Sequence, residues 1–180
     1  MVEDGDENLV RRSLNGDRGA FGELVRRYER PVYNAALRML RRPEDAQDVA
    51  QTVFLKAYEH LADFDHSYRF YSWIYRIALN ESLNQLKRRM PESAVPEDEI
   101  DSGPGPEDQV RRQQLARGLE GALMNLKPEQ RGVVVLKHIL GCSYEEISQI
   151  LEIPEKTVKS RLFTARQLLR DLLVERGLGR

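Results

Sequence analysis

Cysteine is nearly absent from this chain of 180 residues, in which Cys142 is the single example. One cysteine excludes an intramolecular disulfide, a multi-cysteine zinc site and a CxxC redox pair, and it fits a reducing compartment. The histidines His60, His66 and His138 are widely spaced and have no neighbouring ligands at metal spacing. We therefore expect neither a metal site nor a cofactor.

Long apolar runs are also missing. No uncharged apolar stretch approaches the roughly 18 residues that a membrane helix needs. Residues 1–7 are acidic and lack the basic and apolar regions of a signal peptide. These absences predict a soluble, cytoplasmic protein.

Catalytic patterns are equally scarce. The sequence contains no phosphate-binding glycine-rich loop and no convincing arrangement of Ser, His and Asp. Catalysis therefore has no positive support, and we expect a protein that is not an enzyme.

An excess of either charge is absent, because 28 basic residues meet 29 acidic ones for a net charge of −1. A stand-alone nucleic-acid-binding domain is usually basic. Either this protein does not bind nucleic acid, or another component supplies much of the affinity. The average conceals an uneven distribution, with a net charge of −7 over residues 91–110 and +5 over residues 111–180.

Residues 91–110 differ in composition from both flanks. They hold four of the eight prolines, seven acidic residues and no Lys or Arg. Proline opposes helix formation, and like charges keep a segment extended and solvated. We therefore expect a flexible acidic linker between an N-terminal domain of residues 1–90 and a C-terminal domain of residues 111–180.

Helical periodicity dominates both flanks. With 41% hydrophobic and 32% charged residues, the chain suits a soluble, helix-rich protein and not a disordered one. Strand signals are almost absent, so the expected fold is all-α with two small helical domains. Apolar residues at three- and four-residue spacing predict helices over residues 20–41, 46–61, 71–89, 111–126, 129–140, 144–151 and 155–175.

The C-terminal half contains the pattern of a helix-turn-helix. Ser143 and Glu146 form a capping box before a helix of about eight residues. A short turn at 152–153 follows, and Pro154 stands at or near the first position of the next helix. Two helices joined by a tight turn are typical of this motif. The core side of the second helix is expected to be Val158, Leu162, Ala165, Leu168, Leu169 and Leu172.

The opposite face of that second helix is polar and basic. Lys159 and Ser160 are best placed for base contacts, and Phe163 or Thr164 suits a thymine methyl. A solvated basic face on a packing helix is the alternative, and Tyr144 suits phosphate binding and packing equally. The residues suited to phosphate contacts are Lys156, Arg161 and Arg166.

The helix that begins near Pro43 has two different faces. Leu55 is a large apolar residue on the polar side, where it stands among acids. Such a face suits an interface with a basic partner helix, but single exposed apolar residues are common, and the pattern alone favours a solvated face. The polar side holds Asp45, Asp48, Gln51, Thr52, Leu55 and Lys56, and the buried side holds Ala46, Val49, Ala50, Val53, Ala57 and Leu61, with Phe54 and Tyr58 beside it.

Residues 64–73 contain five aromatic side chains. Rings, amides and cations together suit single-stranded nucleic acid or a base turned out of its stack. The alternative is a small aromatic core, which we favour for Phe70, Trp73 and Tyr75 but not for the loop 65–69. The following helix carries a polar stripe of Arg76, Asn80, Asn84 and Lys87.

Five stretches in order form a specific pattern: AFGELVRRY at 20–28, DAQDVAQTVFLKAY at 45–58, YSWIYRIALN at 71–80, SYEEI at 143–147 and TVKSRL at 157–162. Together with the linker they span nearly the whole chain. The pattern resembles the bacterial sigma-70 family, and within it the two-domain extracytoplasmic-function (ECF) RNA polymerase sigma factors. The resemblance implies a sigma domain 2 bundle and a sigma domain 4 helix-turn-helix.

The resemblance also implies partners and roles. The helix 45–58 would dock on the clamp helices of the largest catalytic subunit of core RNA polymerase, and the flap of the second-largest subunit would be a further contact. The polymerase-binding residues would be Asp45, Asp48, Gln51, Thr52, Phe54, Leu55 and Lys56.

Two promoter elements would be recognised, one in each domain. The minus-ten element, duplex and melted strand, would be bound by Asp65, His66, Ser67, Tyr68, Arg69, Tyr75, Arg76, Asn80, Asn84, Lys87 and Arg88. The minus-thirty-five duplex would be bound by Tyr144, Lys156, Thr157, Lys159, Ser160, Arg161, Phe163, Thr164 and Arg166. Thr164 stands where relatives often have a basic residue. Cys142 stands where leucine is common, which implies a packing residue.

The implied function is promoter selection and help with melting at transcription initiation, in a stress or envelope response and under an anti-sigma factor. Near-neutral charge then has an explanation, because core polymerase contributes to promoter affinity. Two alternatives remain open. One is a stand-alone helix-turn-helix regulator, and the other is an enzyme acting on nucleic acid.

Overall fold

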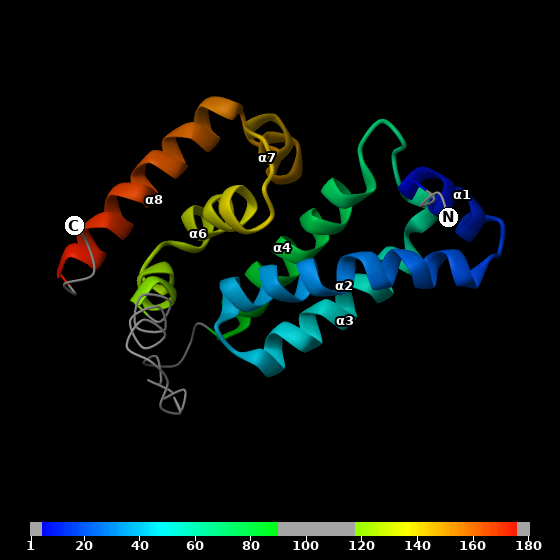
Figure 1. Cartoon of the computed structure of the whole chain (residues 1–180), viewed down its shortest axis with the longest axis horizontal. Helices are drawn as coiled ribbons and strands as arrows, with labels where there is room; N and C mark the ends of the chain where they lie inside the picture. The colour runs from blue at the N-terminus through cyan, green and yellow to red at the C-terminus, as the bar shows by residue number, and fades with distance from the viewer. Residues whose placement is uncertain (1–4, 90–117, 176–180) are drawn as a thin grey trace, which may run out of the picture.

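The computed structural model describes residues 5–89 and 118–175, and every regular element in these ranges is helical (Figure 1). The expected all-α fold is confirmed. The N-terminal elements are α1 (Asp6–Leu14), α2 (Arg18–Leu40), α3 (Pro43–Glu59), the 3₁₀ turn η1 (Leu61–Asp63) and α4 (Phe70–Arg89). The C-terminal elements are a helical segment at 118–124, α6 (Pro128–Val134), the π-helical turn η2 (Val135–Ile139), α7 (Tyr144–Leu151) and α8 (Glu155–Glu175). The expected linker at 91–110 lies outside the described residues.

Helices α2, α3 and α4 pack against one another as a bundle. Local signals fix their ends, since the Asp17 side chain caps α2 by accepting from the Ala20 N–H at 3.1 Å. Arg41 ends α2 in the left-handed conformation, and Pro43 opens α3 at a position where its missing N–H costs nothing. Fully buried side chains of this bundle include Leu24, Val32, Met39, Val53, Ile74 and Leu79.

Helix α1 was not expected from the sequence. It buries Leu9 and Val10, and its Asp6 carboxylate accepts from Arg27 Nη1 at 2.5 Å and from the Tyr28 hydroxyl. Acidic residues in its first turn and arginines in its last turn complement the helix dipole. Nine residues alone would be marginal as a helix, so this packing on α2 stabilises it.

The expected helix-turn-helix is confirmed as α7 and α8. Both hydrogen bonds of the capping box form: the Glu146 N–H donates to the Ser143 hydroxyl at 3.1 Å, and the Ser143 N–H donates to the Glu146 carboxylate at 2.7 Å. Glu152 closes α7 in the left-handed conformation, with φ 53°. Val158, Leu162 and Ala165 are buried as expected.

The expected core side of α8 is correct only as far as Ala165. Beyond it, Leu168 is 40% exposed, Leu169 packs partly on the core, and Leu172 is half-buried outside the core cluster. The last turns of α8 therefore extend beyond the hydrophobic core.

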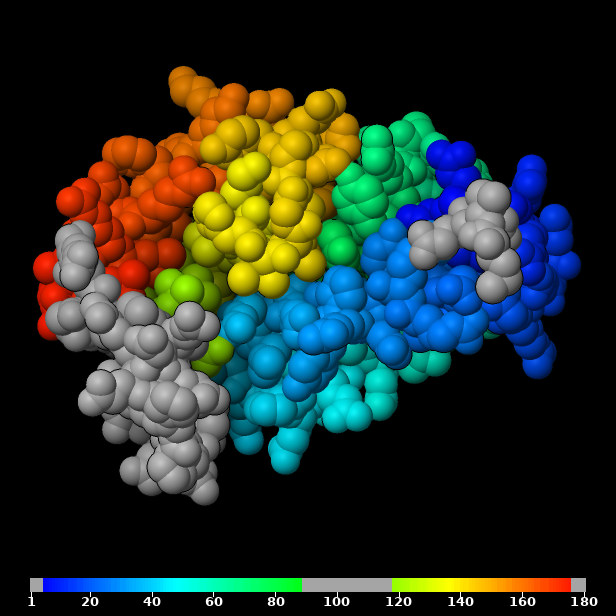
Figure 2. All heavy atoms as spheres, in the orientation of Figure 1, coloured from blue at the N-terminus to red at the C-terminus, as the bar shows by residue number. Residues whose placement is uncertain are grey.

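The two halves of the chain share one hydrophobic core. Helix α7 packs on α4, while α6 and η2 pack on α2. Figure 2 shows the yellow residues of this C-terminal region lying directly against the blue and green N-terminal bundle. The sequence left the relative arrangement of the halves open, and the structure has them packed together.

Candidate functional site

The polar face of α3 is exposed, as its pattern predicts. Leu55 is 63% exposed, although it is a large apolar side chain. Asp48, Gln51 and Lys56 are exposed around it, and Thr52 and Phe54 are half-buried. An apolar side chain with an acidic and polar surround is typical of a protein contact site.

Asp45 does not belong to that exposed face. It is 8% exposed, and Gln85 Nε2 of α4 donates to its Oδ1 at 3.5 Å, while Arg42 Nε lies 3.9 Å from Oδ2. The expectation that Asp45 shares the polar face was wrong, because this position in the first turn of α3 points towards α4. Asp45 therefore joins two helices of the bundle.

The loop 65–69 is exposed along its whole length. Asp65 Oδ1 accepts the Ser67 N–H at 2.8 Å, and this hydrogen bond lowers the pKa of the Asp65 carboxyl. Phe64 and Phe70 are buried on either side and anchor the loop. The sequence thus folds a tight turn whose outward side chains, His66, Ser67, Tyr68 and Arg69, are available to a ligand.

The polar stripe of α4 is mostly open, with Asn80, Asn84, Lys87 and Arg88 exposed. Tyr75 is different, since it is 7% exposed and its ring meets Tyr28 edge to face at 6.2 Å. Burial raises the pKa of the Tyr75 phenol to about 12. Its place among the minus-ten residues is therefore wrong for this structure, and the core role favoured by the aromatic pattern holds.

The outer face of α8 presents the expected basic and polar side chains. Phe163 is 66% exposed beside Lys159, Ser160 and Thr164. Lys159 Nζ lies 3.0 Å from the Glu155 carboxylate and 5.5 Å from the centre of the Tyr144 ring. Lys156 and Arg166 are also exposed, while Thr157 and Tyr144 are half-buried.

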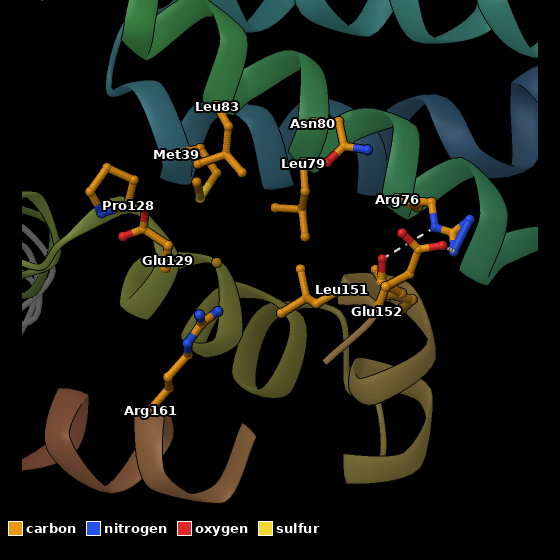
Figure 3. A pocket seen from close by; sticks show the side chains of 12 residues that line it. Met39, Arg76, Leu79, Asn80, Leu83, Pro128, Glu129, Leu151, Glu152 and Arg161 are labelled. Carbon is orange, nitrogen blue, oxygen red and sulfur yellow. Dashed lines mark hydrogen bonds and ion pairs between the residues drawn. The ribbon is translucent and has the colours of Figure 1, made fainter. Parts of the chain in front are cut away.

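Arg161 lies on a different side of α8. It lines a cavity of about 150 Å³ between the two halves, together with Met39, Leu79 and Leu151 (Figure 3). Each residue of an α-helix is rotated by about 100° from the one before it, so Arg161, two positions from both Lys159 and Phe163, faces nearly the opposite side of α8. The structure therefore does not bring Arg161 together with the other residues expected at the minus-thirty-five element.

The structure brings the α4 stripe into contact with the helix-turn-helix, which the sequence analysis did not anticipate. Arg76 Nη2 pairs with the Glu152 carboxylate at 2.5 Å, and Arg76 Nε donates to the Ile150 carbonyl at 3.4 Å. The Tyr71 hydroxyl donates to Glu146. That bond and the Ser143 N–H lower the pKa of Glu146, while burial raises the pKa of Tyr71 to about 12.

A buried arginine also joins the halves. Arg131 is 5% exposed and donates to the carbonyls of Leu123, Met124 and Leu126, and to Met39 at the end of α2 at 2.5 Å. Burial lowers the pKa of this guanidinium. The sequence analysis did not single out this residue, and its one signal is an arginine placed beside the apolar run 133–136.

Cys142 is buried, and burial raises the pKa of its thiol to about 11. A thiol with a raised pKa is a poor nucleophile, so Cys142 is a packing residue, as the resemblance implied. Across residues 5–89 and 118–175 no group of three or more His, Cys, Asp or Glu side chains could hold a metal ion. In the same ranges no helix is long and apolar enough to span a membrane.

Comparison with known proteins accounts for most of the chain. The family models for sigma-70 region 2 and sigma-70 region 4 match residues 24–91 and 116–169. The RNA polymerase sigma-H factor of Pseudomonas aeruginosa is 33% identical, with 94% of each chain covered. The ECF RNA polymerase sigma-E factor of Escherichia coli K12 is 36% identical, over 91% of this chain and 92% of that protein.

A solved structure agrees with these sequence matches. CnrH, determined in complex with the cytosolic domain of CnrY, is 30% identical and superposes with a TM-score of 0.75 over 96% of this chain and 99% of its own. The ranges matched by the two family models include every candidate residue named above. The chain therefore belongs to the sigma-70 family and is a member of its ECF sigma factor group.

Proposed function

We propose that this ECF sigma factor binds core RNA polymerase through α3, and that its two domains contact the two elements of a promoter. The observation that supports this best is the presence of two chemically different exposed faces on one chain. One is the acidic face around Leu55, and the other is the basic face around Lys159 and Phe163. A stand-alone regulator would need only the second face.

The docking step uses the exposed side of α3. Leu55 would fill an apolar site on the clamp helices, while the Asp48 carboxylate would face basic side chains of the polymerase. Burying one leucine side chain contributes about 1.5–3 kcal/mol, and the surrounding charges add orientation and association rate. Asp45 has no direct part in this contact, because it is buried between α3 and α4.

The duplex step uses α8. Lys159 and Ser160 lie near the helix N-terminus, the part of a helix-turn-helix that enters the major groove. Phe163 offers an apolar surface to a thymine methyl, and Lys156 and Arg166 neutralise phosphates. The proposed boundaries of this domain are residues 111–180.

The melting step uses the loop 65–69 and α4 in the domain of residues 1–90. His66 and Tyr68 would stack on unpaired bases, and Asn80 and Asn84 would bind base edges. Lys87 and Arg88 would hold the phosphates. We assign no catalytic step to this chain, since the polymerase supplies the chemistry.

A regulatory protein partner and a cytoplasmic location complete the proposal. CnrH, which is similar along its whole length, was solved with the cytosolic domain of CnrY. An anti-sigma factor covering α3, α4 or α8 would compete with polymerase and promoter. A stress or envelope response is the proposed setting.

In vitro transcription tests the proposal. The protein is mixed with sigma-free bacterial core polymerase and genomic DNA of the source organism, and transcript 5′ ends are sequenced. We expect discrete starts that share two spaced upstream motifs. Background starts alone, from a folded protein that also fails to bind core polymerase, would contradict the proposal and favour the stand-alone regulator.

A further inference from the structure

A contact between η2 and α8 places a histidine beside the face that we assign to the duplex. His138 is exposed on η2, and its Nε2 atom lies 3.3 Å from Nη2 of Arg166, an exposed residue of α8. We propose that His138 is a further duplex-binding residue, which takes up a proton when a DNA phosphate binds at Arg166. The inference rests on the proposed duplex step of α8 and adds to it a contact from outside the helix-turn-helix.

Arg166 lies on the same side of α8 as the residues assigned to base contacts. It follows Lys159 by seven positions, and seven residues make about two turns of an α-helix, so the two side chains leave the helix in nearly the same direction. A guanidinium carries five N–H donors, and one nitrogen of Arg166 faces His138. Arg166 therefore keeps donors for a phosphate that approaches from the DNA side.

Basic side chains link His138 to the N-terminal turns of α8. Lys137 precedes it on η2, and Lys137 Nζ lies 4.8 Å from the centre of the Tyr144 ring. Lys159 Nζ lies 5.5 Å from the same ring centre. These contacts form a row of basic side chains from Arg166 and His138, through Lys137, to Lys159. A row of this kind is the electrostatic footprint that DNA phosphates require.

The charges that act on His138 favour a neutral ring in the free protein. Burial, the charge of Arg166 and the charge of Lys137 all lower the pKa of His138 below its ordinary value of 6.5. A neutral imidazole can accept the Arg166 N–H at Nε2, as the contact requires.

The other elements that pack on η2 are α2, α6 and α7, and their charged groups have settings of their own. Arg38 of α2 pairs with Glu120, Arg131 of α6 donates to main-chain carbonyls, Glu129 of α6 lines the cavity between the halves, Glu146 of α7 accepts from Tyr71 and from the Ser143 N–H, and Glu145 of α7 is exposed. The charges that move the pKa of His138 are those of the two cations, Arg166 and Lys137.

A bound phosphate reverses this balance. A DNA phosphate that accepts from Arg166 brings a negative charge close to Nε2 of His138, and an opposite charge within about 4–6 Å favours the protonated imidazole. The ring then takes one proton from solvent and changes from an acceptor of the Arg166 N–H to a donor to the phosphate. The single contact between the two side chains is thereby replaced by two charge-assisted hydrogen bonds to one phosphate.

Proton uptake on binding fixes the direction of the pH effect. The duplex-bound form holds the proton of His138 more tightly than the free form does. Duplex affinity therefore rises as the pH falls from the pKa of the bound form to the pKa of the free form, and it is constant outside this window. Because the pKa of His138 in the free chain lies below 6.5, the window includes mildly acidic pH.

The other two histidines have different neighbours and serve as references. His60 follows α3, and its Nδ1 lies 3.1 Å from the Asp63 carboxylate. The His66 ring meets Phe64 edge to face, with 5.1 Å between the ring centres. Both lie in the N-terminal half, away from α8 in the sequence and outside the duplex step. His60→Gln is therefore the matched control for His138→Gln.

The first measurement is the affinity of the full chain for a fluorescent duplex that carries the minus-thirty-five motif found from the transcript starts. Anisotropy is recorded from about pH 8 to about pH 5.5 at constant ionic strength, a range that contains the ordinary pKa of histidine. The wild type should bind about three- to tenfold more tightly at the acidic end, since a tenfold gain corresponds to a pKa difference of about one between bound and free forms.

His138→Gln should lose this rise, because glutamine offers an oxygen to Arg166 but takes up no proton. At about pH 8 its affinity should equal that of the wild type, which also shows that the variant is folded. His60→Gln should keep the pH profile of the wild type.

The second measurement is NMR titration of the imidazole protons, with and without the same duplex. The chain has three histidines, so His138→Gln and His60→Gln assign the signals. The duplex should raise the pKa of His138 and leave that of His60 unchanged. Arg166→Gln should raise the pKa of His138 in the free chain, because it removes a neighbouring positive charge. In this variant the duplex should raise the pKa of His138 less than in the wild type.

Three results would overturn the inference and leave the proposed function standing. One is duplex binding with the same pH profile in the wild type and in His138→Gln. Another is a pKa of His138 that the duplex leaves unchanged. The third is loss of the acidic rise in His60→Gln as well, which would assign the proton uptake to another group. Failure of the proposed duplex step has a different signature, since the wild type would then bind the duplex at no pH.

Discussion

Asp48 is the residue at which a single change of charge best tests the proposed polymerase contact. It is exposed on α3 beside Leu55, and its replacement leaves the core untouched. Asp48→Arg should abolish binding to core polymerase, since a basic partner surface would meet a like charge. The free energy of unfolding should change by no more than about 0.5 kcal/mol, as for other surface substitutions.

The measurement is core binding by fluorescence anisotropy, with urea denaturation for the fold. Glu29→Arg makes the same charge change on an exposed position of α2 and should bind normally. Normal core affinity of Asp48→Arg would contradict the docking face.

Two lysines of α8 separate base contact from phosphate contact. Lys159 lies where a major-groove helix meets bases, so Lys159→Ala should cost about 1–3 kcal/mol and change the ranking of promoters. Lys156→Ala should weaken binding to all promoters about equally. It should also reduce, by about one, the slope of the logarithm of the binding constant against the logarithm of the salt concentration. Transcription from a library randomised at the minus-thirty-five motif, at several salt concentrations, measures both effects. Identical profiles for the two variants would contradict the assignment.

At the scale of helices and turns, Arg131 joins the ends of several elements. Four carbonyls accept its donors, and one of them is Met39 at the end of α2. Arg131→Met would leave these buried acceptors without a partner, so the free energy of unfolding should fall by about 3 kcal/mol or more. Arg131→Lys should recover only part of this, because an ammonium lacks the planar fork of a guanidinium. Urea denaturation of the wild type and both variants checks this order of stability. Arg170→Met makes the same substitution at an exposed position of α8 and serves as the control.

Which elements could be predicted depends on where their signals lie. The helix-turn-helix has its cap, turn and apolar spacing within about thirty residues, and all three were visible in the sequence. Helix α1 has only two buried residues, and its stability comes from contacts with α2 that no local pattern contains. The burial of Asp45 and the position of Arg161 also depend on neighbours distant in sequence.

At the scale of the whole molecule, the arrangement of the halves could not be predicted. The bonds from Tyr71 to Glu146 and from Arg76 to Glu152 join residues 75 and 76 positions apart. Composition and periodicity carry no signal for such pairs. The candidate faces on α3 and α8 could be predicted, because each is formed by one helix.

Glu146 makes the stability of the packed molecule depend on pH. The Tyr71 hydroxyl and the Ser143 N–H hold the pKa of its carboxyl below the ordinary value of 4.5, and Arg69 acts in the same direction. The lowered pKa stabilises the fold above pH 4.5, and this contribution is lost as the pH falls through the lower folded value. Urea midpoints of the wild type should therefore fall more steeply than those of Glu146→Gln between about pH 5 and 3. Parallel curves would deny Glu146 this role.

A shared core predicts that the two halves unfold together. The hydrophobic cluster is continuous from α2 and α4 into η2 and α7, so separating the halves exposes apolar surface on both. Calorimetry of the wild type should show one transition, with equal calorimetric and van't Hoff enthalpies. Tyr71→Phe/Glu152→Gln removes one hydroxyl and one negative charge from the contacts between α4 and α7. In this variant the ratio of the calorimetric to the van't Hoff enthalpy should rise above one, because weaker contacts let the less stable half unfold first. The control Tyr33→Phe/Glu145→Gln removes the same groups at a half-buried tyrosine of α2 and an exposed glutamate of α7, and it should keep one transition. Two separate transitions in the wild type would mean that the contacts between the halves are too weak to couple their unfolding. The packing of one half on the other would then contribute little to the stability of either.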